Sequence, residues 1–256
     1  MVVSDGARIS ATVEESGDEP LMLARTLSGI PVLVSPDRYL AGTIAARRFG
    51  ADVMLLDDGF QHLRLARDLD LLVVSMGDLA ERVLPSGRLR EPLSAARGAD
   101  ALLIYGSADE AALVGEALAV HTVFTVTRRY GAVTPLAAAP LRGTRIVAVG
   151  GVADPGRFFT AVRDQGFEVL TEYAFRDHHW FTPADVSRIT ARARSVNADG
   201  VVTTAKDAVR LESLLSQRLD TVPWAVLPME VDVEPGDAFA SWLWPRLRRD
   251  PPGSGT

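Results

Sequence analysis

The sequence predicts an α/β protein built around parallel β-sheet. Short apolar runs alternate with amphipathic stretches of helical period along most of the 256 residues. Continuous apolar runs of this length are typical of strands whose two faces are both covered by helices, as in parallel sheets. Regular alternation of helix and strand is the pattern of the α/β class. A chain of this length accommodates one large core or two smaller ones.

The predicted strands are apolar runs bounded by turn residues. They span residues 51–56, 69–74, 99–105, 144–149, 200–204 and 221–227. The predicted helices combine an apolar stripe with capping residues at several starts. They span residues 19–29, 154–166, 182–195 and 205–217.

The stretch 121–143 breaks this rhythm, because TVFTVT alternates in the manner of a strand and a Gly-, Pro- and Ala-rich region follows. We therefore expect residues 1–122 to form one lobe, 123–143 a strand-like linker and 144–249 a second α/β lobe. The Pro-, Gly- and Ser-rich end, residues 250–256, is expected to be a disordered tail.

Composition excludes several classes of function. The net charge of −6 argues against nucleic acid as the main partner, because binding phosphates needs a basic surface. The absence of cysteine excludes disulfides and thiolate metal sites. No signal peptide is evident, and no apolar run reaches the ~20 residues of a membrane-spanning helix, so we expect a soluble or peripherally attached chain. Lys206 is the only lysine, so a mechanism that requires lysine has one candidate.

The segment DDGFQH directly follows the predicted strand 51–56. Ligands of α/β proteins bind at the carboxyl ends of strands, where Asp57 and Asp58 are expected. Two carboxylates there suit Mg²⁺, which commonly joins protein carboxylates to substrate phosphates, and the layout resembles a Walker B segment. The alternative is a simple turn or cap. With Gln61 and His62 adjacent, we favour the functional interpretation.

Asp18, in the segment SGDEP, precedes an amphipathic helix. Its position suits a helix cap, with acidic residues in the first turn. It also suits a general base, which needs a carboxylate near a reacting hydroxyl group. The segment RLREP, residues 88–92, places two arginines beside a glutamate. Arginine forks suit phosphates, and a solvated basic loop is the equal alternative.

The segment FRDHHWFTPAD, residues 175–185, holds two of the four histidines. His178 and His179 are expected in a loop before a helix that Thr182 caps. Two histidines beside Asp177 are too few for a clear zinc site, so acid–base work or transition-state contact is favoured. The aromatic residues that follow indicate a partly buried loop.

Two further strand-to-helix junctions carry polar residues. The Gly-Gly turn in 147–159 matches neither common phosphate-binding glycine motif and is interpreted first as a structural turn. In TTAKDAVR, residues 203–210, we expect Lys206 and Asp207 either to contact a ligand or to cap the helix.

Taken together, six ordered motifs resemble the tetraacyldisaccharide 4′-kinases, the lipid A 4′-kinases. They are GDEP, DDGFQH, LPSGRLREPL, GG…P.RFF, F.DHH.FT and T.KDAVR, and they extend from Ser16 to about Arg210. The resemblance implies transfer of the ATP γ-phosphate, with Mg²⁺, to the 4′-hydroxyl of a lipid A precursor disaccharide. It also implies a two-lobed, P-loop-kinase-like α/β fold and peripheral contact with the cytoplasmic face of the bacterial inner membrane.

The resemblance also implies roles for individual residues. Asp18 is expected to act as the base, with His178 more strongly indicated than His179 as its partner. Arg90 and Glu91 are expected to line the reaction centre, with Arg90 catalytic and Glu91 in cofactor binding. The residues expected to manage Mg²⁺ and the nucleotide are Asp57, Asp58, Gln61 and His62, of which the two aspartates are the metal ligands.

The chain departs from the family pattern at one motif. No G-x-x-x-x-G-K-[ST] phosphate loop occurs, and Lys206 lies too late in the chain to replace its lysine. We therefore expect an incomplete N-terminal lobe, as in a fragment, a mis-started gene, or a homologue that binds glycolipid or nucleotide without catalysis. An active kinase with a different ATP clamp and a metal-dependent hydrolase are the remaining hypotheses. Ala205 also stands where the family pattern has an acidic residue.

Overall fold

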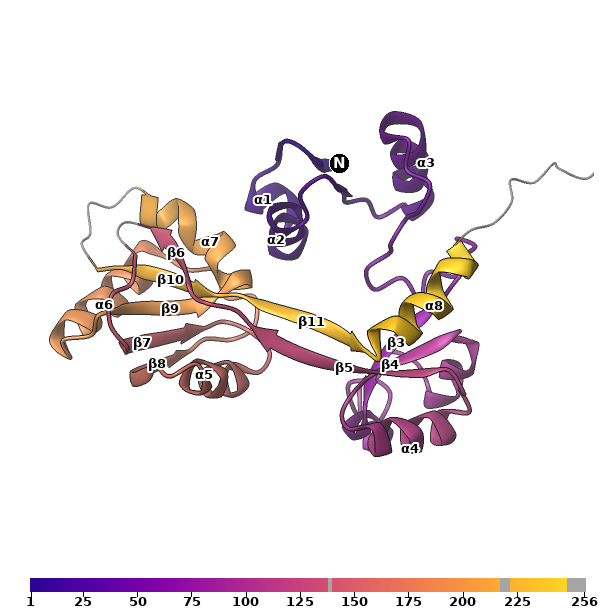
Figure 1. Cartoon of the computed structure of the whole chain (residues 1–256). Helices are drawn as coiled ribbons and strands as arrows, with labels where there is room; N and C mark the ends of the chain where they lie inside the picture. Colours follow the sequence, from indigo (N-terminus) through magenta and orange to yellow (C-terminus); the bar gives the residue numbers. More distant parts are fainter. Residues whose placement is uncertain (138–139, 217–221, 248–256) are drawn as a thin grey trace, which may run out of the picture. The chain divides into compact units, whose positions relative to one another are not determined.

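The computed structural model describes residues 1–137, 140–216 and 222–247 (Figure 1). The chain divides into two compact units, of which the first comprises Met1–Asp52 and Tyr130–Glu230. The second comprises Val53–Arg129 and Val231–Thr256. This division differs from the expected lobe of residues 1–122, because the N-terminal 52 residues group with the C-terminal half of the chain. The expected tail, residues 250–256, lies outside the described residues.

The first unit contains a five-stranded sheet in the order β6-β10-β9-β7-β8. Its strands are β6 (Thr134–Ala137), β7 (Arg145–Gly150), β8 (Glu168–Ala174), β9 (Gly200–Thr204) and β10 (Trp224–Leu227). β8, β7, β9 and β10 are parallel, and β6 pairs antiparallel with β10. The predicted strands 144–149, 200–204 and 221–227 therefore correspond to β7, β9 and β10, and residue 221 lies outside the described residues.

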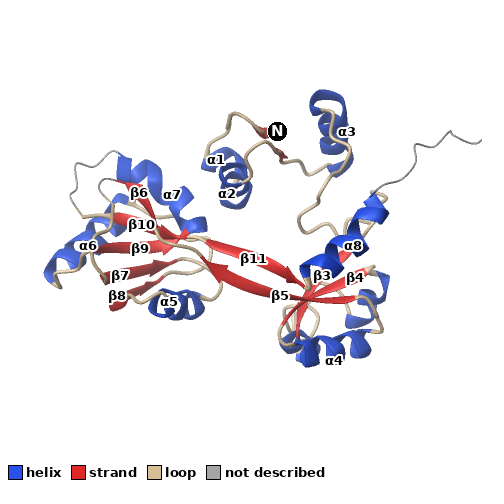
Figure 2. Ribbon diagram, viewed as in Figure 1, coloured by secondary structure: helices blue, strands red, loops and turns tan. Residues whose placement is uncertain are grey.

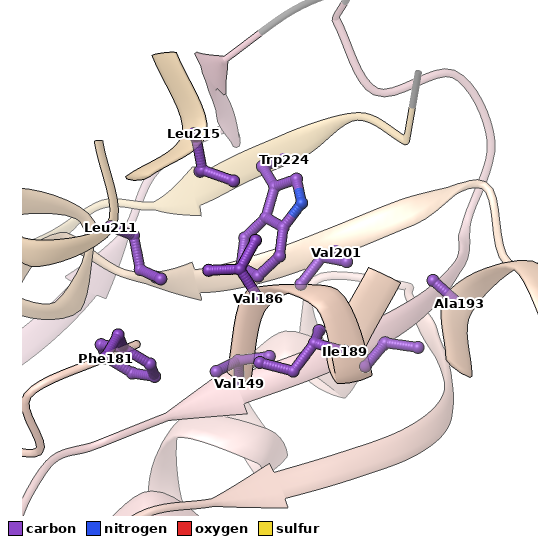
Figure 3. Close-up of a cluster of buried hydrophobic side chains, with 10 residues drawn as sticks. Val149, Phe181, Val186, Ile189, Ala193, Val201, Leu211, Leu215 and Trp224 are labelled. Carbon is purple, nitrogen blue, oxygen red and sulfur yellow. The ribbon is translucent and has the colours of Figure 1, made fainter. Parts of the chain in front are cut away.

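Helices cover both faces of this sheet. They are α5 (Pro155–Asp164), α6 (Pro183–Ser195) and α7 (Ala205–Ser216). Along β7, Val149 packs with residues of α6 and α7 (Figure 3). Val147 belongs to the same cluster, whereas Ile146 and Ala148 pack with α5. This strict alternation is what buries a parallel strand on two sides. Trp224 is 1% exposed in the first of these clusters, and burying a large apolar side chain contributes about 1.5–3 kcal/mol.

The N-terminal segment adds small elements to the first unit. They are β1 (Val2–Asp5), α1 (Val13–Ser16), α2 (Asp18–Thr26), β2 (Pro31–Leu33) and α3 (Arg38–Phe49), with β1 antiparallel to β2. Leu21 and Ala24 of α2 join a buried cluster that also contains Val209 of α7. This apolar contact between α2 and α7 brings the N-terminus of α2 to the N-terminal half of α7.

The second unit contains a four-stranded sheet in the order β11-β5-β4-β3 (Figure 2). Its strands are β3 (Leu71–Ser75), β4 (Ala101–Tyr105), β5 (Val123–Tyr130) and β11 (Met229–Glu234), and β3, β4 and β5 are parallel. The helical elements are the 3₁₀ helices η1 (Met76–Ala80) and η2 (Leu93–Gly98), and the α-helices α4 (Ala108–Leu118) and α8 (Gly236–Leu247). The expected linker 123–143 thus consists of two strands, β5 and β6, each paired within a sheet, with residues 138–139 outside the described part.

The predicted strand 51–56 is wrong. These residues form no regular element (Figure 2), and Leu55 is 94% and Val53 59% exposed. An apolar run becomes a strand only when a neighbour pairs with its backbone N–H and C=O groups. β3 ends the strand order of its sheet, and within the described residues it pairs with β4 alone. Residues 51–56 are not paired with this open edge of β3 in the described part of the chain, so the segment stays irregular.

Candidate functional site

Asp18 opens α2 and lies at the centre of a cluster of charged side chains in the first unit. Its Oδ2 accepts a short hydrogen bond from Arg210 of α7, and Oδ1 accepts the Glu19 N–H at 3.1 Å. Its side chain is 12% exposed. Burial opposes ionisation, but the hydrogen bond and charge of Arg210, with smaller electrostatic contributions from the neighbouring His178 and Lys206, outweigh it and lower the pKa of Asp18. The carboxylate is therefore ionised at neutral pH.

His178 lies beside Asp18, with 3.2 Å between its Nδ1 and Asp18 Oδ2. Its backbone is left-handed, with φ of 56°, and its N–H donates to the Asp177 carboxylate at 3.0 Å. Left-handed backbone at a residue other than glycine costs roughly 1–3 kcal/mol and clusters at functional sites. The imidazole is 54% exposed, so its other face is open to a ligand.

His179 has a different environment from its neighbour. Its ring stacks on Phe175 at 4.4 Å and meets Phe181 edge-on at 5.0 Å. Its Nε2 lies 3.3 Å from Asp185, a residue of the first turn of α6. These contacts fasten the loop to α6, which supports His178 rather than His179 as the partner of Asp18.

Lys206, in the first turn of α7, joins the same cluster. Its Nζ lies 2.9 Å from Glu19 Oε1, 3.3 Å from Asp177 Oδ1 and 3.2 Å from His178 Nε2. Burial favours the neutral amine, but the hydrogen bonds and charges of Glu19 and Asp177 prevail and raise the pKa of Lys206. Lys206 is therefore an ammonium ion at neutral pH, and it ties the DHH loop to the start of α2.

Arg210, one helical turn after Lys206, is the most buried cation of the cluster, with a side chain 3% exposed. Besides Asp18, its guanidinium donates to the His179 carbonyl oxygen at 2.6 Å and lies 3.8 Å from Asp207 Oδ1. A planar guanidinium can serve several oxygens at once. Arg210 thus joins α2, the histidine loop and α7 at one point.

Asp207 is fully buried beneath this cluster and fastens the Gly-Gly turn. Its Oδ2 accepts the Gly151 N–H at 2.8 Å and the Thr204 hydroxyl at 2.8 Å, whereas Oδ1 has no hydrogen bond. Burial raises the pKa of Asp207 against the opposing hydrogen bonds and the charges of Arg210 and Lys206. A Cβ at Gly151 would lie 2.9 Å from Asp207 Oδ1, so this close approach requires glycine. The sequence-based interpretation of this turn as structural agrees with these contacts.

A second group of predicted site residues lies in the second unit. Asp57 and Asp58 occupy a turn, and both are exposed. Asp58 is left-handed, with φ of 51°, and its Oδ2 accepts a hydrogen bond from Arg90 Nη2 at 2.9 Å. The structure therefore brings the DDGFQH and RLREP segments together through this one ion pair.

The rest of the DDGFQH segment is held by a neighbouring arginine. Arg67 forms a paired contact with Asp70, at 2.5 and 3.0 Å, and donates to the His62 carbonyl oxygen at 2.9 Å. Gln61 is exposed, and His62 and Glu91 are half-buried. The part of these three residues in cofactor binding stays a prediction.

Within residues 1–137, 140–216 and 222–247, no three His, Cys, Asp or Glu side chains gather as a metal cage. Mg²⁺ bound to nucleotides commonly uses one or two protein carboxylates, phosphates and water instead. The adjacent, exposed carboxylates of Asp57 and Asp58 fit that mode of binding.

Sequence reasoning did not assign a role to Arg210, although the residue ends the T.KDAVR motif. The available signal was spacing, because positions 206 and 210 are four apart and share one helix face. For Glu19 the sequence likewise indicates only a place in the first turn of a helix. Their partners are remote in sequence, so the motif spacing alone did not identify the contacts.

Known proteins resemble this chain over nearly its full length, including both groups of candidate site residues. The family model described as LpxK, tetraacyldisaccharide-1-P 4′-kinase, matches residues 1–248. The chain belongs to the tetraacyldisaccharide 4′-kinase family. The tetraacyldisaccharide 4′-kinase of Geobacter metallireducens is 39% identical over 241 residues, which cover 90% of this chain and 70% of the relative. That of Geobacter sulfurreducens is 37% identical over 250 residues, covering 93% and 68%. The resemblance inferred from the six motifs is confirmed.

A solved structure of this kinase family shares the fold. The crystal structure of LpxK from Aquifex aeolicus in complex with ATP matches with a TM-score of 0.73 at 27% identity. The match covers 97% of this chain and 74% of the other. It confirms the predicted α/β class. In the present chain, no helix within residues 1–137, 140–216 and 222–247 is both long and apolar enough to span a bilayer.

Proposed function

We propose that this chain catalyses transfer of the ATP γ-phosphate to the 4′-hydroxyl of tetraacyldisaccharide 1-phosphate. The observation that carries the proposal is the pair of Asp18 Oδ2 and His178 Nδ1, 3.2 Å apart and flanked by two cations. Family membership supports the reaction class, and the ATP complex of the Aquifex aeolicus relative supports the donor.

Asp18 is assigned as the base that accepts the proton of the attacking hydroxyl. The lowered pKa keeps it ionised, so its oxygen is available at neutral pH. A carboxylate of low basicity suffices, because phosphoryl transfer passes through a loose transition state and depends mainly on positioning and charge. His178, whose Nδ1 lies 3.2 Å from Asp18 Oδ2, is assigned to orient and polarise the Asp18 carboxylate.

Asp57 and Asp58 are assigned to Mg²⁺ and the phosphates of ATP. Mg²⁺, when bound with ATP, neutralises charge that develops on the phosphate oxygens. Arg90 is assigned to the same phosphates, because a guanidinium suits phosphate oxygens. Arg90 now pairs with Asp58, and the two side chains are 59% and 70% exposed. Exposed ion pairs of this kind are weak, so Arg90 can exchange Asp58 for a phosphate. Gln61, His62 and Glu91 complete the proposed nucleotide contacts.

The acylated substrate places the reaction at a membrane surface, and we propose peripheral contact through α8. Phe239 and Trp242 of this helix pack on Phe124, with ring centres 5.1 and 5.7 Å from its ring. Trp244 is 57% exposed and free of these ring contacts. Exposed tryptophans beside arginines suit the bilayer interface. Replacing Trp244 by Ser should lower co-sedimentation with anionic phospholipid vesicles, and unchanged co-sedimentation would contradict this contact.

The kinase proposal is tested by radiolabel transfer from Mg·[γ-³²P]ATP to tetraacyldisaccharide 1-phosphate by this 256-residue chain. Asp18→Asn should lower kcat at least about 100-fold, the usual contribution of a positioned base. Equal rates for the variant and the original chain would refute the base assignment. If the original chain transfers no label but binds the glycolipid in vesicles, it is instead a non-catalytic binding homologue.

A further inference from the structure

The ammonium group of Lys206 contacts the histidine as well as two carboxylates. Its three neighbours are Glu19, Asp177 and the Nε2 of His178, at 2.9, 3.3 and 3.2 Å. An ammonium group has three donors and no acceptor, so these neighbours use its full capacity. The side chain is only 16% exposed, which leaves little room for a different arrangement.

The contact between Lys206 and His178 fixes which ring nitrogen carries a proton. Lys206 is charged, because Glu19 and Asp177 stabilise its ammonium form against the cost of burial. It can therefore only donate, and Nε2 of His178 must accept with a free lone pair. A neutral imidazole with an unprotonated Nε2 has its single N–H at Nδ1. This is the nitrogen that lies 3.2 Å from Asp18 Oδ2.

Packing does not fix the orientation of the His178 ring, since its side chain is 54% exposed. The neighbouring His179, in contrast, is held by Phe175 and Phe181. Polar contacts at the two ring nitrogens must therefore orient His178. In the other tautomer, the Nδ1 lone pair would face a carboxylate oxygen, and the Nε2 proton would face an ammonium ion at 3.2 Å, since the nearest carboxylate oxygen, Asp177 Oδ2, lies 3.8 Å away, beyond hydrogen-bond distance.

We propose that Lys206 is a positioning residue, which holds His178 in the Nδ1–H tautomer and so directs its proton toward Asp18. Its catalytic consequence rests on the proposed kinase function, but the tautomer itself does not. The rival role for the only lysine is direct contact with a phosphate of the nucleotide. The two roles differ in the kinetic constant that they change, because positioning affects kcat and nucleotide contact affects KM.

The tautomer is measured by long-range ¹H–¹⁵N correlation spectra of the full chain labelled with ¹⁵N-histidine. The chain has four histidines, and His178→Gln assigns the resonance of interest. In the original chain we expect a protonated Nδ1 and an unprotonated Nε2. Lys206→Met should shift the ring to the other tautomer or to a mixture, whereas Lys206→Arg, which retains the charge and donors, should preserve the Nδ1–H form.

Arg25→Met is the matched control for Lys206→Met. Arg25 pairs with Glu212 at 2.5 Å, so this variant also removes a cation from an ion pair between α2 and α7. It leaves His178 untouched, and its spectrum should match that of the original chain. Circular dichroism of all variants shows whether the fold persists.

A proton on Nε2 in the original chain would overturn the proposal, as would an unchanged tautomer in Lys206→Met. In phosphoryl-transfer assays, Lys206→Met should lower kcat at least about tenfold while KM for ATP changes by less than about twofold. A rise in KM with unchanged kcat would replace positioning by phosphate contact. Absence of transfer in the original chain would refute the kinase proposal, while the spectra would still decide the role of Lys206 in holding the tautomer.

Discussion

Replacing Arg210 by Met tests whether the buried ion pair with Asp18 holds α2 on α7. Methionine retains much of the apolar stem of the side chain but removes the charge and all five donors. The variant loses the hydrogen bonds to Asp18 and to the His179 carbonyl oxygen. It leaves a mostly buried carboxylate without its strongest partner.

The expected loss follows from the burial of the two partners. Removing one member of a buried ion pair destabilises a protein by about 3–5 kcal/mol. Asp18 keeps the neighbouring His178 and 12% exposure, so we expect the lower end, roughly 3 kcal/mol. Arg25→Met is the control, because Arg25 and Glu212 are 36% and 48% exposed and such a pair contributes at most about 1 kcal/mol.

The assay is native-state hydrogen exchange in low urea, read on peptides from α2 and α7. A local readout is required because the chain has two units and need not unfold in a single transition. The double variant Asp18→Asn/Arg210→Met should lose at least about 1 kcal/mol less than the sum of the single losses, since the two groups interact directly. Losses that add within about 0.5 kcal/mol, or an Arg210→Met loss no larger than the control, would refute the reasoning.

Three further predictions concern pH, a close backbone contact and an exposed pair. Because the pKa of Asp18 is lowered in the fold, its stabilising contribution is present above its ordinary pKa of 3.8 and is lost as pH falls through the lowered value. Asp18→Asn should therefore reduce the loss of unfolding free energy on acidification, measured with urea at several pH values. An unchanged dependence of the unfolding free energy on pH would contradict this. Gly151→Ala should destabilise the first unit by about 1–3 kcal/mol, because the new Cβ meets the fixed carboxylate of Asp207, and a urea midpoint equal to that of the original chain would exclude the clash. Asp58→Asn should change stability by less than about 1 kcal/mol, because the ion pair with Arg90 is exposed, yet should weaken Mg·ATP binding in calorimetry; unchanged affinity would remove Asp58 from the proposed metal site.

Periodicity predicted the elements whose burial is a local property of the sequence. β7 and β9 alternate between two apolar faces, and α5, α6 and α7 combine an apolar stripe with capping residues. The same reasoning failed at residues 51–56, because apolar content does not show whether a pairing strand is present. It also missed β8, an edge strand in which polar residues interrupt the apolar run.

The candidate site shows a similar division. Motifs identified Asp18, His178 and Lys206 as chemically notable, but not their mutual contacts. Asp18 and Arg210 are 192 positions apart, so only the packing of α2 against α7 brings them together. The preference for His178 over His179 likewise rests on the contacts of the His179 ring with Phe175 and Phe181, and two adjacent residues in one loop give no local signal of that difference.

Because Lys206 is the only lysine of the chain, a lysine-specific reagent acts at the candidate site alone. A protease that cleaves after lysine has one possible cut in the chain, which would release residues 1–206 and 207–256. That bond lies in the first turn of α7, beneath the contacts of Lys206 with Glu19 and Asp177. Cleavage requires this turn to open, so in limiting protease its rate follows the population of the open form. The rate at which the two fragments form therefore measures the population in which the first turn of α7 is open. A bound ligand that stabilises the site lowers this rate.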